Sequence, residues 1–126
     1  MQRVSYLEQS EQPRIDSDRL VELYVAMGEA GARRTMADAI EAIGARVTEM
    51  FNALHSGRFD LLSDLSKEVR DTALPVGLTS CAFVAEDLLD CAKIADQAAT
   101  AAVLNRLARL GAASARQSWS IRDFSS

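Results

Sequence analysis

The chain has 126 residues, of which 48% are hydrophobic and 25% charged, a composition typical of one globular domain with its own core. Its formal net charge of -4 argues against nucleic-acid and anionic-membrane partners, because both are bound through an excess of Lys and Arg. No apolar run approaches the roughly 20 residues that span a bilayer, and the polar start of the chain lacks the apolar region of a signal peptide. We therefore expect a cytoplasmic protein with no membrane and no nucleic-acid partner.

The first stretch, residues 1–16, is polar, contains Pro13 and shows no sustained periodicity. It is expected to form a flexible N-terminal arm, or one that orders only by docking. Ser17 is a candidate N-cap for a short additional helix, whose apolar residues recur at helical spacing. Gly28 and Gly31 weaken or close this helix, which is expected to cover one end of the domain.

The second helix is predicted from about Ala32 to Leu54, where apolar residues recur every three or four positions. Thr35 and Asp38 resemble a capping box near its start. Gly57 then supplies a C-terminal signal, and the short connection that remains places the next helix antiparallel to this one. The apolar positions are Met36, Ile40, Ile43, Val47, Phe51 and Leu54.

The third helix, within residues 58–79, has one dry side and one charged side. Its apolar residues recur at steps of three and four, which predicts a single buried stripe. At about 100° per residue, the opposite side carries four charged residues. The stripe consists of Leu62, Leu65, Val69, Ala73 and Val76, and the charged side of Asp60, Asp64, Lys67 and Asp71.

Two residues punctuate the end of the third helix. Pro75 is expected to end it at Leu74, because proline lacks the backbone donor and clashes with the preceding turn. Gly77 then allows a left-handed turn, and Thr79 or Ser80 is expected to cap the helix that follows.

Two further helices complete the pattern. The fourth buries one apolar stripe, while Phe83 and Ile94 fall on its far side. The last helix is predicted over about residues 97–118, where several alanines give high helix propensity, and residues 121–126 are expected to form a tail.

No stretch of the chain alternates as a strand does. We therefore predict an all-α protein, an antiparallel four-helix bundle over residues 17–120 that includes the short additional N-terminal helix. The predicted core includes Ile40, Ile43, Val47, Phe51, Leu62, Leu65, Val69, Leu88, Val103 and Leu107.

The third helix also carries a family resemblance. Histidine-containing phosphotransfer (HPt) domains of bacterial phosphorelays contain a helix of pattern apolar-x-x-Ala-His-x-Leu-Lys-Gly-Ser-Ala, followed by Leu-Gly and a new helix. Residues 65–73 (LSKEVRDTA) and 76–78 (VGL) resemble this pattern position by position, and helix order and spacing are similar over about four fifths of the chain. The phosphoaccepting histidine falls on Lys67, the basic residue on Arg70, and the glycine that lets a partner approach falls on Asp71.

The resemblance implies a phosphorelay signalling protein that is itself not phosphorylated. An exposed lysine ammonium is protonated at neutral pH and has no lone pair with which to attack a phosphoryl group. Recognition survives, because a receiver domain presents an acidic pocket to which a cation can bind. The implied partner is a response-regulator receiver domain or a histidine kinase. The implied partner-binding residues on the third helix are Asp64, Lys67, Arg70 and Asp71.

Two alternatives stay open for these residues and for the function. The charged side can be a plain surface ladder, in which Lys67 pairs with Asp64 at i,i+3 and with Asp71 at i,i+4. The chain can also be a helical-bundle structural or oligomerisation protein unrelated to phosphorelay, since a fold alone does not define a function.

Phe83 and Ile94 place two large apolar groups on the charged side of the fourth helix, so we expect them to be covered. One candidate cover is the N-terminal arm, through Tyr6 and Leu7. The other is the same helix of a second subunit, in a two-fold homodimer.

No catalytic, cofactor or metal site is expected. His55, the only histidine, lies at the predicted C-terminus of the second helix, where an exposed imidazole is favourable, and no other ligand cluster accompanies it. The carboxylates of the third helix lie opposite its apolar stripe and lack the burial that acid–base catalysis needs. Cys81 and Cys91 are about 15 Å apart along one helix, too far for a disulfide, and are expected to be reduced core residues.

Overall fold

The computed structural model describes residues 11–125, which form helices and short connections without any strand. The α-helices are α2 (Ser17–His55), α3 (Phe59–Ala73), α4 (Thr79–Lys93) and α5 (Gln97–Ser125), and a 3-10 helix, η1 (Leu74–Val76), follows α3. The predicted all-α class is confirmed for this part of the chain. None of its helices combines the length and the apolar character needed to cross a membrane.

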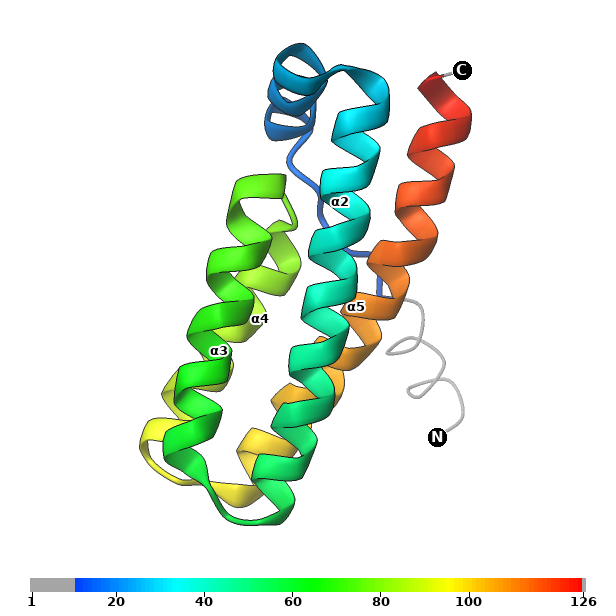
Figure 1. The fold of residues 1–126 in the computed structure, drawn as a ribbon. Coiled ribbons are helices and arrows are strands. Elements are labelled where there is room, and N and C mark those ends of the chain that lie inside the picture. Colours follow the sequence, from blue (N-terminus) through cyan, green and yellow to red (C-terminus); the bar gives the residue numbers. More distant parts are fainter. Residues whose placement is uncertain (1–10, 126) are drawn as a thin grey trace.

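The helices surround one hydrophobic core, and each lies beside two others (Figure 1). α2 packs against α3 and α5, and α4 packs against the same two helices. Each helix contributes one apolar stripe, so the core contains side chains from all of them. The largest fully buried side chains include Ile43, Met50, Leu62, Val69, Leu88, Leu104 and Leu107.

Most of the predicted core is confirmed, but the prediction is wrong for one residue. The buried members are Ile43, Val47, Leu62, Leu65, Val69, Leu88 and Leu107. Ile40 and Val103 are partly buried and pack against the core. Phe51, however, is 36% exposed. The buried stripe of α2 passes through Met50 and Leu54, and Phe51 lies about 100° around the helix from Met50.

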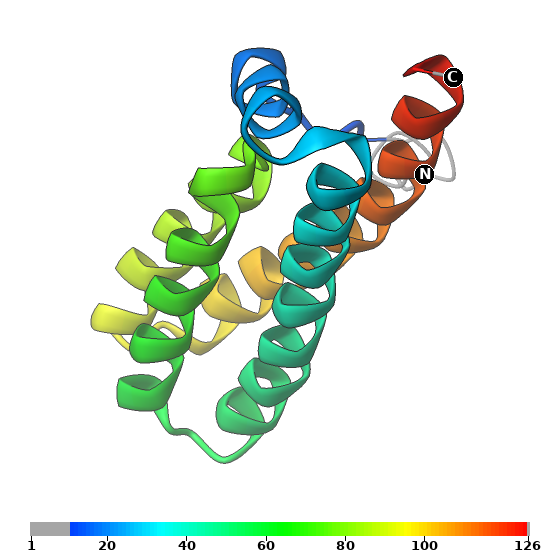
Figure 2. The same cartoon turned by 45° about the horizontal axis from the view of Figure 1, so that its top comes forward.

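A sharp kink divides α2 at Gly28, where φ is 75° and ψ is 173°. Among the amino acids, glycine alone adopts this region without a large steric cost. The kink turns the first segment, residues 17–27, across the end of the domain at which η1 lies (Figure 2). The short helix that was expected to cover one end is therefore present, as the first segment of α2.

The predicted signals for the start of each segment of α2 are not found in the structure. Asp16, not Ser17, is the N-cap, and its carboxylate accepts a hydrogen bond from a first-turn amide at 3.0 Å. The capping box predicted at Thr35 and Asp38 is wrong, because the helix already continues through these positions. The hydroxyl of Thr35 instead donates to the sulfur of Met27, 3.2 Å away across the kink.

The chain passes from α3 to α4 through a turn closed by two backbone hydrogen bonds. The amide of Gly77 donates to the carbonyl of Leu74 at 3.1 Å, and the amide of Leu78 donates to that of Ala73 at 3.0 Å. This pair of bonds defines a Schellman motif. Gly77 has a φ of 79°, so the predicted left-handed turn after the proline is confirmed.

The last helix is longer than predicted. α5 continues to Ser125, past the expected end at residue 118 and through residues 121–125 of the expected tail. The reason is visible in the sequence, because no glycine or proline follows Gly111 to interrupt the helix.

Candidate partner-binding surface

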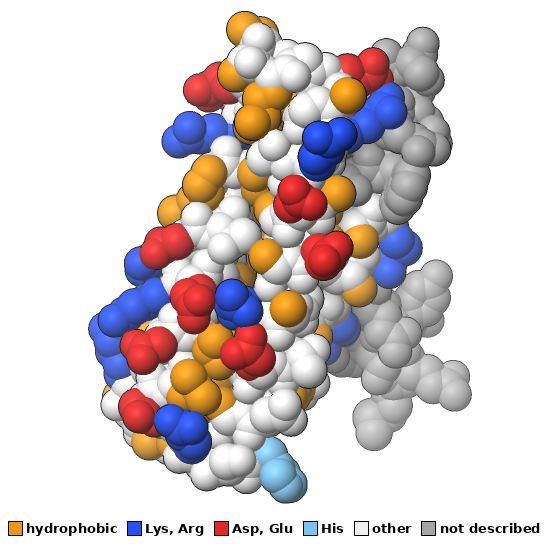
Figure 3. Space-filling view, in the orientation of Figure 1, with side chains coloured by type: hydrophobic (Ala, Val, Ile, Leu, Met, Phe, Trp, Pro, Cys, Tyr) orange, Lys and Arg blue, Asp and Glu red, His pale blue; other side chains and the backbone are white. Residues whose placement is uncertain are grey.

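The four residues implied by the family resemblance lie on the solvent side of α3. Asp64, Lys67 and Asp71 are exposed, and Arg70 is half-buried at the edge of the same surface. Charged side chains of both signs gather over α3 and the neighbouring part of α2 (Figure 3). We call the surface formed by these four residues the α3 face.

The ion pairs of the charge ladder, which was the alternative considered for the α3 face, are not formed. Arg70 forms an ion pair with the carboxylate of Asp71, with 3.0 Å between Nε and Oδ1. Lys67 makes no ion pair within 4.0 Å with any residue that the structure describes, and neither does Asp64. The ammonium of Lys67 therefore keeps its three donors for water or for a partner.

The base of the α3 face is firmly packed. Leu62, Leu65 and Val69 are each 3% exposed or less, and the buried hydroxyl of Ser66 donates to the carbonyl of Leu62 at 2.7 Å. At its edge, Arg46 of α2 reaches across to Glu68 of α3, with 3.2 Å between Nε and Oε1. The side chains of the α3 face thus project from a helix that is fixed on its other side.

His55 lies apart from the α3 face. It is the last residue of α2, it is exposed, and its imidazole projects at one end of the molecule (Figure 3). The predicted solvent-facing position is confirmed. Within the described range there is no group of three or more His, Cys, Asp or Glu side chains that could hold a metal ion.

Both cysteines are free, as predicted, but only Cys81 is a core residue. Burial raises the pKa of the Cys81 thiol, whose Sγ lies 3.8 Å from the hydroxyl of Ser114. Cys91 is partly exposed, and its pKa is raised by partial burial and by nearby carboxylates, Asp96 foremost. Both thiols therefore stay protonated at neutral pH, which is the opposite of an activated nucleophile.

A second surface, which the sequence analysis missed, lies where residues 11–16 pass over α4. We call these residues the strap. The amide of Arg14 donates to the hydroxyl of Ser80 at 2.6 Å, and the amide of Asp16 donates to the carbonyl of Gly77 at 2.8 Å. Ser80 therefore holds the strap and does not cap α4, and Thr79 does not cap it either. The N-terminal arm is docked over residues 11–16.

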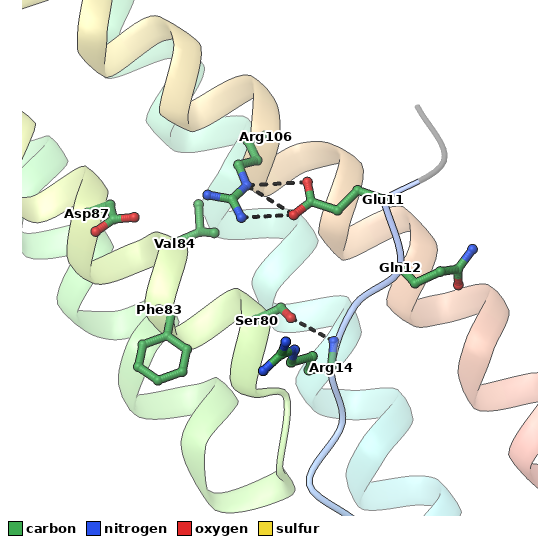
Figure 4. A pocket seen from close by; sticks show the side chains of 8 residues that line it. All are labelled: Glu11, Gln12, Arg14, Ser80, Phe83, Val84, Asp87 and Arg106. Atoms are coloured by element: carbon green, nitrogen blue, oxygen red, sulfur yellow. Dashed lines mark hydrogen bonds and ion pairs between the residues drawn. The ribbon is translucent and has the colours of Figure 1, made fainter. Parts of the chain in front are cut away.

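An ion pair fixes the start of the strap to α5 (Figure 4). Arg106 donates to the Glu11 carboxylate from Nη2 at 2.8 Å and from Nε at 3.2 Å. This hydrogen bonding holds the pKa of Glu11 below its usual value and raises that of Arg106. Beside the pair, a hollow of about 440 Å³ opens between the strap, α4 and α5, with Phe83 and Asp87 on its α4 side.

No local pattern in the sequence predicts the strap. Its partners Ser80 and Arg106 lie 66 and 95 positions away from the strap residues they bind. In the folded chain Glu11, Pro13 and Ile15 are less exposed than the residues between them, but this alternation of burial is seen only in the structure.

Comparisons with models of protein families, with curated proteins and with solved structures found no match to this chain.

Proposed function

We propose that the protein is a degenerate HPt-like phosphorelay adaptor that binds a response-regulator receiver domain, or a histidine kinase, through the α3 face. The proposal rests on the resemblance of residues 65–78 to the HPt motif and on one structural observation. Lys67, at the position of the phosphoaccepting histidine, is exposed in the middle of α3 and has no ion-pair partner among the described residues.

The helical arrangement supports this assignment. In an antiparallel four-helix bundle of the HPt type, the motif helix presents its functional residue outward while its apolar stripe enters the core. α3 has this arrangement, with Leu65 and Val69 buried and Lys67 between them in sequence but on the solvent side. An unpaired ammonium on a fixed helix suits an acidic pocket. It has no ion pair within the protein to break when it binds, and the helix that carries it is already ordered.

The chemistry at Lys67 limits the protein to binding. Phosphotransfer through a histidine needs a neutral imidazole nitrogen, and a protonated ammonium offers no lone pair. In addition, Asp71 places a carboxylate, held by Arg70, where the family has glycine. Negative charge at this point repels a phosphoryl group. The adaptor therefore competes with true phosphotransfer domains for a receiver and does not relay phosphate itself.

The decisive experiment measures binding to purified receiver domains of response regulators from the same genome. We expect one or a few of them to bind, and we expect Lys67→Glu to weaken binding by about tenfold or more, equivalent to at least about 1.4 kcal/mol. Lys93→Glu is the matched control. It makes the same charge change at the only other lysine, which lies at the end of α4.

Three results would contradict the proposal. They are no binding by any receiver or kinase domain in the panel, equal losses for the two lysine variants, and binding that Lys67→Glu leaves unchanged. Equal losses would mean that net charge, and not the α3 face, controls the association.

A phosphorylation assay tests the non-catalytic half of the proposal. Incubation with a phosphorylated receiver domain is expected to leave no acid-labile label on this chain. A phosphohistidine at His55 would overturn this expectation. The double variant Lys67→His, Asp71→Gly restores the two motif residues. It serves as the positive control of the labelling assay, provided that it still binds the receiver.

A structural or oligomerisation protein remains the second candidate, because several large apolar side chains are exposed. Val25 is 82% exposed, Ile94 74% and Phe83 64%. If the chain is a dimer in light scattering, and if Phe83→Glu makes it a monomer while no receiver binds, this second function is the correct one.

A further inference from the structure

The outer side of α4 carries two large apolar side chains that are exposed to solvent. Phe83 is 64% exposed, and Ile94, the C-cap of the helix, is 74% exposed. Tyr6 and Leu7, which were expected as one cover for them, lie outside the residues that the structure describes. α4 packs against α3 and α5, so the side of α4 that points away from both is open to a partner.

Two exposed carboxylates, Asp87 and Asp90, lie between these apolar side chains. At about 100° per residue, all four residues fall within an arc of about 60° and follow one another along α4. At about 1.5 Å per residue, Phe83 and Ile94 are about 17 Å apart. We call Phe83, Asp87, Asp90 and Ile94 the α4 line.

The carboxylates of the α4 line are not engaged in ion pairs. Neither Asp87 nor Asp90 has a cationic group within 4.0 Å among the described residues. The pKa of Arg106 is raised by its hydrogen bond to Glu11 and, to a smaller extent, by Asp87, so this guanidinium is already bound by another carboxylate. Lys93, the last residue of α4, pairs with neither aspartate.

The charge around Cys91 shows the same excess of carboxylates. Partial burial raises the pKa of this thiol first, and Asp96, Asp87 and Asp90 raise it further. A thiolate is negatively charged, so a raised pKa is what unneutralised carboxylates nearby produce. A cation is therefore favoured beside this part of α4.

A second copy of the chain is a poor occupant of the α4 line. In an antiparallel two-fold contact that pairs Phe83 with Ile94 of the other copy, Asp87 meets Asp90 of the other copy. In a parallel two-fold contact, each aspartate meets its own counterpart. Like charges meet in both arrangements, which opposes the association.

A hollow beside Phe83 gives this surface depth. It measures about 440 Å³ and opens between the strap, α4 and α5, with Phe83 and Asp87 on its α4 side and Val84 on its wall (Figure 4). A side chain of a partner can therefore enter beside the Phe83 ring and contact apolar surface there.

We propose that the α4 line binds a basic amphipathic helix of a partner protein. Apolar residues of this helix pack on Phe83 and Ile94, and Lys or Arg residues between them bind Asp87 and Asp90. A partner helix laid antiparallel to α4 presents its side chains at the same spacing, so one face of it can match all four residues. The α4 line shares no residue with the α3 face, so the two surfaces can be tested independently.

The test uses a synthetic helical peptide with two leucines at the spacing of Phe83 and Ile94 and two lysines at the spacing of Asp87 and Asp90. Fluorescence anisotropy with the full-length chain at low ionic strength is expected to show binding, and a peptide with glutamates in place of both lysines should bind several-fold more weakly.

Matched variants locate the binding site on the protein. Asp90→Lys should weaken binding of the lysine peptide several-fold, whereas Glu41→Lys, the same charge change at an exposed position of α2, should have little effect. Phe83→Ser should also weaken it, and Val25→Ser, at another exposed apolar residue, should not. In the amide NMR spectrum, the peptide should shift resonances of α4 and the strap.

Five results would overturn the proposal. They are equal binding of the lysine and glutamate peptides, equal losses for Asp90→Lys and Glu41→Lys, and peptide-induced shifts on the α3 face in place of α4. The fourth is a dimer in light scattering that Phe83→Ser makes monomeric, because a second copy is then the occupant. The last is peptide binding that appears only after deletion of residues 1–10, because the chain's own N-terminal segment then occupies the α4 line.

Discussion

The α3 face and the strap side of α4 and α5 are two surfaces of one helical domain, built from contacts of very different range. On the α3 face, Arg70 pairs with its neighbour in sequence, Asp71. On the strap side, Glu11 pairs with Arg106 across 95 positions. The first surface is determined by one helix, whereas the second exists only when the chain is folded.

This difference separates the residues that we propose bind a partner from the residues that stabilise the fold. The polar residues of the α3 face make few contacts with the rest of the protein, so they can change with little effect on folding. The strap residues tie the N-terminal arm to two helices, so a change there affects the folded state. We therefore expect the loss of stability to be largest for substitutions beneath the α3 face, smaller for substitutions at the strap and smallest for substitutions on the α3 face itself.

The largest effect is expected beneath the α3 face. Leu65 is 3% exposed, and Leu65→Ala removes buried methyl groups and leaves a cavity, which should lower the free energy of unfolding by about 2 to 5 kcal/mol. Lys67→Ala, two residues away on the exposed side, should change it by less than about 0.5 kcal/mol. Urea unfolding followed by circular dichroism measures both. A Leu65→Ala protein as stable as the wild type would refute the core assignment.

The same contrast explains which features could be predicted from the sequence. The stripe of α3 repeats at steps of three and four, so Leu62, Leu65 and Val69 were identified as core residues from the local pattern alone. Phe51 was misassigned because it lies four residues after Val47 and three before Leu54, so it fits the helical steps as well as Met50 does. Burial is decided by position around the helix, and a large side chain one residue away remains outside.

The strap could not be predicted in this way. The hydrogen bonds from Arg14 to Ser80 and from Asp16 to Gly77 are donated by backbone amides, which every residue except proline possesses, so no residue type predicts them. Ser80 has the features of a helix cap, and only the docked strap shows that its hydroxyl has another use. The candidate site on α3 was located from the sequence, but its ion pairing was not, because Arg70 competes with Lys67 for Asp71.

An intermediate effect is expected at Gly77, where the strap meets the turn before α4. A Cβ atom at this position would lie 3.0 Å from the carbonyl oxygen of Asp16 and 3.1 Å from Cβ of Arg19, and φ is already 79°. Gly77→Ala should therefore lower the free energy of unfolding by about 1 to 3 kcal/mol.

Gly44→Ala is the control for Gly77→Ala. Gly44 is exposed in the second segment of α2, and a Cβ atom there would contact nothing within 4 Å. Because alanine is the better helix former, this substitution should raise the stability by up to about 1 kcal/mol. Opposite signs for the two glycines are the expected result in thermal unfolding. If both substitutions stabilise the protein, the strap does not press on Gly77.

A smaller effect than at Gly77 is expected at the Glu11–Arg106 pair, and it should depend on pH. The pKa of Glu11 lies below its ordinary value of 4.5, because Arg106 donates hydrogen bonds to the ionised form. A depressed pKa means that the stabilisation is fully present above the ordinary value and is lost as the pH falls through the value in the folded protein. Both side chains are partly exposed, so the pair is expected to contribute only about 0.2 to 1 kcal/mol.

Glu11→Gln removes this titration and leaves the other carboxylates in place. The wild type should therefore be slightly more stable than Glu11→Gln at about pH 7. The difference should shrink as the pH falls through the pKa of Glu11 in the folded protein, and it should disappear once Glu11 is protonated in both the folded and the unfolded state. Arg106→Gln should give the same convergence, because it removes the same hydrogen bonds from the other side. The measurement is the urea midpoint of each protein across this pH range. A constant difference between wild type and Glu11→Gln at every pH would show that Glu11 holds the strap by packing and not by its charge.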